Sequence, residues 1–136
     1  PNIPEAETLA GMEVRTEDDM FRAADILMSQ GCYGVLIKGG HLSSNNSTDI
    51  LFRQDANPLR LSSRHIDTAN LHGTGCTLSS AIAANMALGY SLEEAVGLAK
   101  EYISMAISCG VDVRTGRGHG PVNHFFDPKP LKKIEL

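Results

Sequence analysis

The stretch that decides the fold lies just past the middle of the chain and reads His72-Gly73-Thr74-Gly75-Cys76-Thr77. Two glycines flank a single residue where a polar loop enters an apolar run, which predicts a tight turn that begins a helix. The backbone N–H groups of such a turn converge on one point, and the helix dipole adds positive potential there. The turn therefore suits a phosphate group, or the charge that develops during phosphoryl transfer.

Cys76 falls in the first turn of this expected helix. A thiolate in that position is stabilised by the helix N-terminus. It could take a proton from an attacking hydroxyl group, or attack as a nucleophile itself. A structural glycine turn with a small buried cysteine explains the same six residues equally well. A Cys/His hydrolase could also be built from Cys76 with His72 or His124, but their spacing gives no distinctive support.

The helix after this turn is expected at about residues 76–88. Residues 68–92 contain no Asp, Glu, Lys or Arg, and their number would suit a membrane span. They also contain asparagine, histidine, glycine and several hydroxyl side chains, which favours a tightly packed helix behind a glycine turn. A second helix is expected to begin at Ser91, with Glu94 completing a capping box, and to end at Gly110.

Toward the N-terminus the pattern alternates helices and strands. Helices are expected at residues 6–10 and behind a cap at Thr16, the second with apolar residues at three- and four-residue steps. The apolar run at 33–38 follows as a strand, in the manner of an αβ unit of a parallel sheet. Beyond a polar loop at 43–47, an antiparallel hairpin is expected. Its strands are at residues 50–52 and 59–61, and its turn is at residues 55–58.

Two weaker signals lie in this part of the chain. Lys38 precedes Gly39 and Gly40 at the end of a predicted strand, where ligands of open α/β sheets bind. Its ammonium could reach phosphate oxygens while the glycines admit a ligand to the backbone, although a surface lysine before a turn is the commoner case. Asn2 and Glu5 could hold a hydrated Mg²⁺ through their oxygens. Alone, this pair is better interpreted as an asparagine cap with a capping-box glutamate.

Composition narrows the class of protein. The 136 residues carry a net charge of −4, and 42% of them are hydrophobic, as in an ordinary globular chain. A nucleic-acid interface would need a basic stripe, and the one basic cluster is interpreted as a solvated tail at Lys129, Lys132 and Lys133. The widely spaced Cys32, Cys76 and Cys109 suit neither a disulfide framework nor a zinc site, and they favour a reducing compartment.

Four runs along the chain combine into a specific pattern: PNIPEAE (1–7), VLIKGGH (35–41), HGTGCTLSSA (72–81) and GHGPVNHF (118–125). In this order and spacing they resemble the hydroxymethylpyrimidine/phosphomethylpyrimidine kinases, thiamine-pathway enzymes of the ribokinase-like fold. The resemblance implies an α/β chain, the C-terminal half of a three-layer α/β/α architecture. It also implies ATP-dependent phosphorylation of 4-amino-5-hydroxymethyl-2-methylpyrimidine and of its monophosphate.

The same resemblance implies a role for each candidate residue. Residues 73–76 correspond to the anion hole around the transferring phosphoryl group, and Cys76 occupies the position of the catalytic base. Asn2 and Glu5 match the residues that position Mg²⁺ and its waters, and Lys38 falls where the family meets the nucleotide phosphates. The implied catalytic residues are Cys76, Gly73, Thr74 and Gly75. The implied nucleotide-binding residues are Lys38, Gly40 and Thr74. The implied metal-binding residues are Asn2 and Glu5.

Chains of this family are about twice as long, and their N-terminal half carries the first strands of the sheet and most of the pyrimidine pocket. We therefore expect residues 1–136 to form a single partial domain of a cytoplasmic protein. Its expected partner is the missing N-terminal half or a second copy in a homodimer, and neither nucleic acid nor a membrane. A pyridoxal-kinase-like vitamin kinase is an alternative, as is an incomplete fragment that only binds nucleotide or packs against its missing half.

Overall fold

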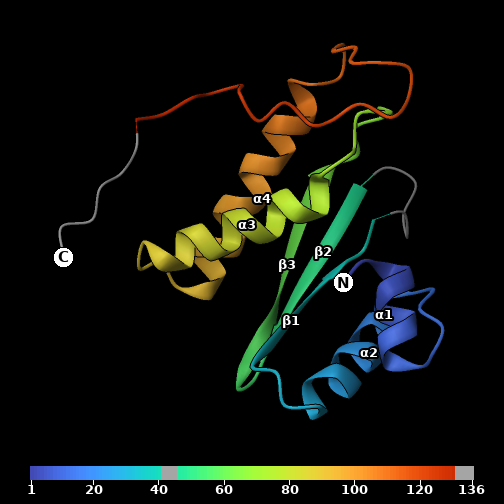
Figure 1. Cartoon of the computed structure of the whole chain (residues 1–136). Coiled ribbons are helices and arrows are strands. Elements are labelled where there is room, and N and C mark those ends of the chain that lie inside the picture. Colours follow the sequence, from blue (N-terminus) through green and yellow to red (C-terminus); the bar gives the residue numbers. More distant parts are fainter. Residues whose placement is uncertain (41–45, 131–136) are drawn as a thin grey trace. The chain divides into compact units, whose positions relative to one another are not determined.

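The computed structural model describes residues 1–40 and 46–130, with four helices and three strands in these ranges (Figure 1). The chain divides into two compact units, Pro1–His65 and Ile66–Leu136. The expectation that it forms one partial domain stays a prediction. In the described ranges, no helix has the length and apolar character needed to cross a bilayer. The predicted tail lysines Lys132 and Lys133 and the first part of the 43–47 loop lie outside the described residues.

Two capped helices open the first unit. Helix α1 (Ile3–Ala10) starts earlier than expected because Asn2 caps it and a proline occupies its first turn, and it ends at Gly11, whose φ is 68°. Helix α2 (Glu17–Ser29) begins behind Thr16, as the sequence indicates. The Thr16 hydroxyl accepts the N–H of Asp19 at 3.2 Å, and the Asp19 carboxylate accepts the N–H of Thr16 at 2.9 Å.

The strands of the first unit form one antiparallel sheet in the order β1-β2-β3. Strand β1 (Gly34–Lys38) confirms the expected apolar run. Strands β2 (Asn46–Arg53) and β3 (Ala56–Arg64) confirm the hairpin, but both are longer than predicted. Strand β1 pairs antiparallel with β2, a pairing that the sequence did not predict. Among the described residues, β1 has a parallel neighbour only in an isolated bridge between Asn2 and Lys38.

The hairpin turn is displaced from the predicted 55–58. It lies before residue 56, where Asp55 takes a φ of 59°, a backbone region that aspartate tolerates better than most residues. Pro58 suggested a turn, but it lies within β3, an edge strand, opposite a register shift in β2. A proline without an N–H is accommodated in that setting.

The core of the first unit lies between α2 and one face of the sheet. The apolar stripe of α2 is buried as its spacing predicts, and Phe21 packs edge-on against Phe52 with ring centroids 5.0 Å apart. Arg60 covers the outer side of the Phe21 ring at 5.4 Å. The buried members of this core are Ala6, Val14, Met20, Ala23, Ala24, Leu27, Val35, Ile37, Ile50 and Phe52.

Gly39 has no room for a side chain, because an added methyl group would collide with the carbonyl of Thr48 on the neighbouring strand. We expect Gly39→Ala to lower the free energy of unfolding by about 1–3 kcal/mol, the usual cost of overpacking. Gly97→Ala is the matched control, because its methyl group meets open space in a helix interior and should raise stability by about 0.5–1 kcal/mol. Urea unfolding of both variants checks this; equal stability of Gly39→Ala and the parent would refute the crowding.

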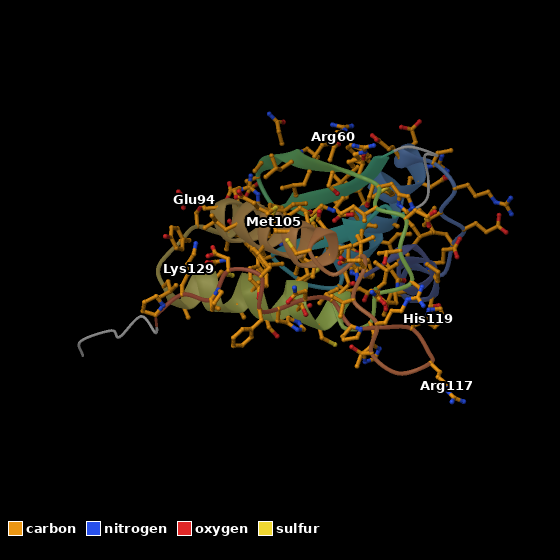
Figure 2. The ribbon with its side chains drawn as sticks, turned by 90° about the horizontal axis from the view of Figure 1, so that it is seen from above. Arg60, Glu94, Met105, Arg117, His119 and Lys129 are labelled. Carbon is orange, nitrogen blue, oxygen red and sulfur yellow. The ribbon has the colours of Figure 1, made fainter. Side chains whose placement is uncertain are left out.

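The second unit is built from two packed helices, α3 (Thr74–Ala87) and α4 (Leu92–Ser108). Helix α4 begins at Ser91 with the predicted capping box to Glu94. Its expected stripe provides most of the buried side chains of this unit. An extended segment follows α4, and Arg117 and His119 project from its exposed loop (Figure 2). The buried apolar residues of the unit are Leu78, Ala95, Val96, Ala99, Ile103, Ala106 and Val122.

The α4 cap gives a testable pH dependence. Hydrogen bonds from the backbone N–H and the hydroxyl of Ser91 lower the pKa of Glu94 from its ordinary 4.5. The stabilisation is therefore complete above pH 4.5 and is lost as the pH falls through this lowered pKa. We expect Glu94→Gln to unfold at a lower temperature than the parent at neutral pH. The melting temperatures of Glu94→Gln and of the parent should converge as the pH is lowered into the acid range. A difference in melting temperature that does not depend on pH would contradict this.

Candidate active site

The glycine turn places free backbone donors at the start of α3. Gly73 adopts a φ of 87°, in the left-handed region, and its carbonyl accepts the N–H of Thr77 at 2.9 Å. The N–H groups of Gly75 and Cys76 donate to no acceptor among the described residues. Free donors in the first turn of a helix are the ordinary means of holding an anion. The structure thus provides two donors for the anion hole that the sequence predicts.

Thr74 is arranged differently from the other residues of this turn. Its N–H and its hydroxyl both donate to the carbonyl of Leu71, at 3.2 and 2.7 Å. The backbone donor of Thr74 is therefore used to close the turn. A role for Thr74 toward an anion, which the resemblance implies, stays a prediction.

Cys76 is an exposed, free thiol in the first turn of α3. Of the two alternatives for this turn, the one with a small buried cysteine does not fit the exposed thiol. The Nε2 of His124 lies 2.8 Å from the hydroxyl of Thr77, so this nitrogen is not paired with the Cys76 thiol. The Cys/His hydrolase interpretation loses that candidate partner.

A buried asparagine that precedes the turn holds the segment after α4, and the sequence did not predict this role. Asn70 is 9% exposed, and its side-chain amide donates to the carbonyls of Gly110 and Val113 at 2.6 and 2.7 Å. A side chain at Gly120 would collide with this same amide. The only sequence signal was the glycine content of residues 110–120, because the partners of Asn70 lie forty or more residues away along the chain.

The segment after α4 also pairs with the residue just before the glycine turn. The N–H of His72 donates to the carbonyl of Gly120 at 3.1 Å, and the N–H of Val122 donates to the carbonyl of His72 at 3.3 Å. These two bonds form a short parallel bridge around Pro121. The third and fourth motifs of the sequence are therefore structurally joined.

Asn2 and Glu5 form the capping box of α1 in the first unit. The Asn2 side chain accepts the N–H of Glu5 at 2.9 Å, and the Glu5 Oε2 accepts the N–H of Asn2 at 2.7 Å. That bond, with a contribution from the charge of Lys38, lowers the pKa of Glu5. The favoured cap interpretation is thus confirmed, but Oε1 of Glu5 has no hydrogen bond from the described residues. It fits a hydrated Mg²⁺, whose waters need such acceptors.

Lys38 ends β1 where the chain turns through Gly39 and Gly40. Lys38 faces Asp49 in the register of β1 and β2, so the two side chains share a face of the sheet. The carboxylate of Asp49, only 4% exposed, accepts the N–H of Gly39 at 3.1 Å. Gly40 has a φ of 46°, in the left-handed region, and a methyl group added there would meet nothing within 4 Å. In the described residues, no cluster of three or more His, Cys, Asp or Glu is arranged to hold a metal.

The candidate residues therefore form two groups, one in each unit. Asn2, Glu5, Lys38 and Gly40 lie in the first unit, while residues 73–76 lie in the second. In the first unit a backbone bridge brings Asn2 beside Lys38, and in the second unit the candidate residues are consecutive. Their functional roles stay predictions.

Comparison with known proteins identifies the family. Residues 1–123 match the family model described as phosphomethylpyrimidine kinase. The chain is 45% identical over 126 residues to the hydroxymethylpyrimidine/phosphomethylpyrimidine kinase of Rhizobium meliloti, covering 92% of this chain and 47% of that protein. It is 50% identical over 132 residues to a thiamine biosynthesis bifunctional protein of Geobacter sulfurreducens, covering 97% of this chain and 26% of that protein.

A solved structure gives the same result for the fold. The ADP complex of Bacillus subtilis pyridoxal kinase matches with a TM-score of 0.80 and 36% identity, over 91% of this chain and 46% of that one. The predicted ribokinase-like α/β fold is confirmed, and the chain spans about half the length of the curated kinases it matches. The match with the family model is nearly as long as the chain, and the chain therefore belongs to the phosphomethylpyrimidine kinase family.

Proposed function

We propose that this chain is the nucleotide-binding part of an ATP-dependent kinase that phosphorylates 4-amino-5-hydroxymethyl-2-methylpyrimidine and its monophosphate in thiamine biosynthesis. The observation that carries the proposal is the first turn of α3, which combines two free N–H donors with an exposed thiol. The names of the Rhizobium meliloti and Geobacter sulfurreducens relatives support the reaction and the pathway. The ADP complex of the Bacillus subtilis relative supports nucleotide binding.

The residues divide the chemistry between them. The Cys76 thiolate takes the proton of the substrate hydroxyl as that oxygen attacks the γ-phosphorus of ATP, and ADP leaves with the electron pair of the broken P–O bond. The N–H groups of Gly75 and Cys76 stabilise the charge on the transferring phosphoryl oxygens. Lys38 contacts the nucleotide phosphates. Mg²⁺, when bound, neutralises phosphate charge, and the residues suited to hold its waters are Asn2 and Glu5.

The substrate is tested by supplying the part of the enzyme that lies beyond this chain. We would combine the chain with the N-terminal half of the Rhizobium meliloti relative and measure ATP-dependent phosphorylation of the hydroxymethylpyrimidine and of pyridoxal. We expect faster turnover of the pyrimidine, because curated relatives at 40–45% identity are named hydroxymethylpyrimidine/phosphomethylpyrimidine kinase. Preference for pyridoxal would support the alternative drawn from structural neighbours at 32–36% identity.

The same assay without the N-terminal half tests the incomplete-fragment alternative. We expect the chain alone to bind nucleotide but not to turn over the pyrimidine. Turnover by the chain alone would refute the view that a partner is needed.

The partner we propose is the complementary N-terminal half. The N–H of Lys38 donates to the carbonyl of Pro1 at 2.8 Å, on the edge of β1 that faces away from β2. Because backbone groups alternate along a strand, the N–H and C=O of Leu36 face this same edge. No described strand pairs there, and such an edge is a template for another strand. Apolar side chains also stay exposed on and after α3 and on α4 (Met105 in Figure 2), namely Met86, Leu88, Leu98 and Met105.

Sedimentation of the chain with and without the N-terminal half tests this partner. A one-to-one complex supports the proposal. A dimer of this chain that persists in the presence of the other half would instead identify a second copy as the partner. We also propose a cytoplasmic location, which the three free cysteines support.

Lys38 gives a direct test of nucleotide binding. We expect Lys38→Ala to weaken ATP binding about ten- to a hundredfold, because one charge-assisted contact to phosphate is worth about 1.5–3 kcal/mol. Calorimetric titration with ATP and Mg²⁺ measures the effect. Lys100→Ala, which removes a lysine from α4, is the control and should bind as the parent does. Equal affinities for all three proteins would exclude a phosphate contact at Lys38.

A further inference from the structure

The fourth sequence motif, residues 118–125, has no part in the chemistry proposed above. Asn123 fixes it to the end of α4. Its N–H donates to the carbonyl of Ala106 at 3.0 Å, and its side-chain amide donates to the C-cap carbonyl of the same helix at 3.2 Å. The hydroxyl of Tyr102 donates to the carbonyl of His124 at 3.3 Å. Three hydrogen bonds at Asn123 and His124 therefore attach this segment to α4 and its C-cap.

The side chain of His124 reaches the first turn of α3. Its Nε2 lies 2.8 Å from the hydroxyl of Thr77, whose N–H closes that turn on the carbonyl of Gly73. The hydroxyl of Thr77 can either donate or accept, so the bond forms with either tautomer of the imidazole. His124 thus links α4 to the residue that directly follows Cys76.

This link compensates for a missing cap. Helices α1, α2 and α4 each begin with a complete capping box. Helix α3 begins at Gly73, which offers no side chain, and it has no side-chain cap. A capping side chain would occupy the N–H groups of the first turn, the donors proposed for the phosphoryl group. The turn therefore needs support that leaves these donors free, and the bond from His124 to Thr77 supplies it from the side.

We infer that His124 is a positioning residue that acts through Thr77 to hold the Gly75 and Cys76 donors and the Cys76 thiol in their working geometry. The inference rests on the proposed function for its catalytic meaning. Small displacements of positioned groups are costly in catalysis, so loss of the bond should lower kcat more than it raises KM for either substrate.

The first experiment needs no kinase activity. In a Cys32→Ser, Cys109→Ser background, Cys76 is the sole thiol, and its alkylation by iodoacetamide at fixed pH is followed by mass spectrometry. Because Cys76 is already exposed, the rate reports how the thiol is placed in the first turn of α3 rather than its access to solvent. We expect His124→Ala to slow alkylation about threefold, a change of the size that charge–helix-end interactions produce.

Matched variants separate positioning from general loosening of the fold. Thr77→Val should slow alkylation as much as His124→Ala, and the double variant should be no slower than either single one. His124→Gln, whose amide can still bond the hydroxyl, should recover most of the parent rate. His119→Ala, at an exposed histidine in the same segment, should match the parent. Additive effects of the two single variants, or a glutamine variant as slow as the alanine variant, would overturn the inference.

The second experiment measures kcat and KM in the chain combined with the N-terminal half. If the parent turns over, His124→Ala should lower kcat about tenfold or more, His124→Gln should restore it, and KM for ATP should change little. An unchanged kcat in His124→Ala would overturn the inference while leaving the proposed function intact. If the parent shows no turnover while the alkylation pattern holds, the proposed function fails and the positioning of Cys76 by His124 stands.

Discussion

Cys76→Ala is expected to lower kcat for the pyrimidine alcohol by about 10²- to 10⁴-fold, the range in which a positioned proton acceptor contributes. The residue sits in the first turn of α3, and its exposed thiol can approach a substrate hydroxyl. Removing it leaves both N–H donors in place, since the alanine backbone provides the same groups. The loss should therefore fall on kcat, while the affinity for ATP should change little.

The measurement is steady-state turnover of the chain combined with the N-terminal half. Cys109→Ala is the control, because it removes another exposed thiol at the end of α4 and not in the turn. Cys76→Ser should remain closer to the alanine variant than to the parent, since a serine hydroxyl is a far weaker proton acceptor than a thiolate. Near-parental turnover in Cys76→Ala would remove Cys76 from the mechanism.

Asn70→Ala should produce the largest loss of stability in the second unit. The substitution removes the donors that satisfy the carbonyls of Gly110 and Val113. Each lost hydrogen bond costs about 0.5–1.5 kcal/mol, because the Gly110 carbonyl still accepts the N–H of Val113 and Val113 itself is exposed. We therefore expect the free energy of unfolding to fall by about 1–3 kcal/mol, with a further small loss from the space that the amide fills beside Gly120.

Urea unfolding measures this loss, and Asn57→Ala in the exposed part of β3 is the matched control. An exposed substitution of that kind should change stability by no more than about 0.5 kcal/mol. Asn70→Asp should be at least as damaging as the alanine variant, because a carboxylate faces two carbonyls without a proton to donate. Parental stability in Asn70→Ala would mean that the two hydrogen bonds contribute nothing to holding the segment.

Local signals predicted much of the fold. Ser91 and Glu94 predicted the start of α4, and the apolar stripe of α2 predicted its buried face. The errors came from features that local sequence does not carry. Pro58 suggested a turn because nothing in the sequence says that β3 is an edge strand. The antiparallel pairing of β1 depends on a strand that lies beyond a loop, so helix–strand order alone did not predict it.

The candidate site divides in the same way. The turn at residues 73–76 was predictable because two glycines before an apolar run have few other uses. The use of the Thr74 N–H within the turn was not predictable, because local backbone geometry decides which carbonyl accepts it. Asn70 and the bond from His124 to Thr77 depend on contacts across forty or more residues. Such partners become visible only once the chain is folded.

The measurement that tests the central claim most directly is a titration of the ¹⁵N-labelled chain with ATP and Mg²⁺, followed by amide NMR. The account predicts saturable shifts of the Gly75 and Cys76 amide resonances, because their free N–H groups receive the phosphates, together with shifts at Lys38. It predicts smaller shifts for an equal concentration of adenosine, which lacks phosphates. Saturable binding that leaves the Gly75 and Cys76 resonances unmoved, or no binding at millimolar ATP, would contradict the account.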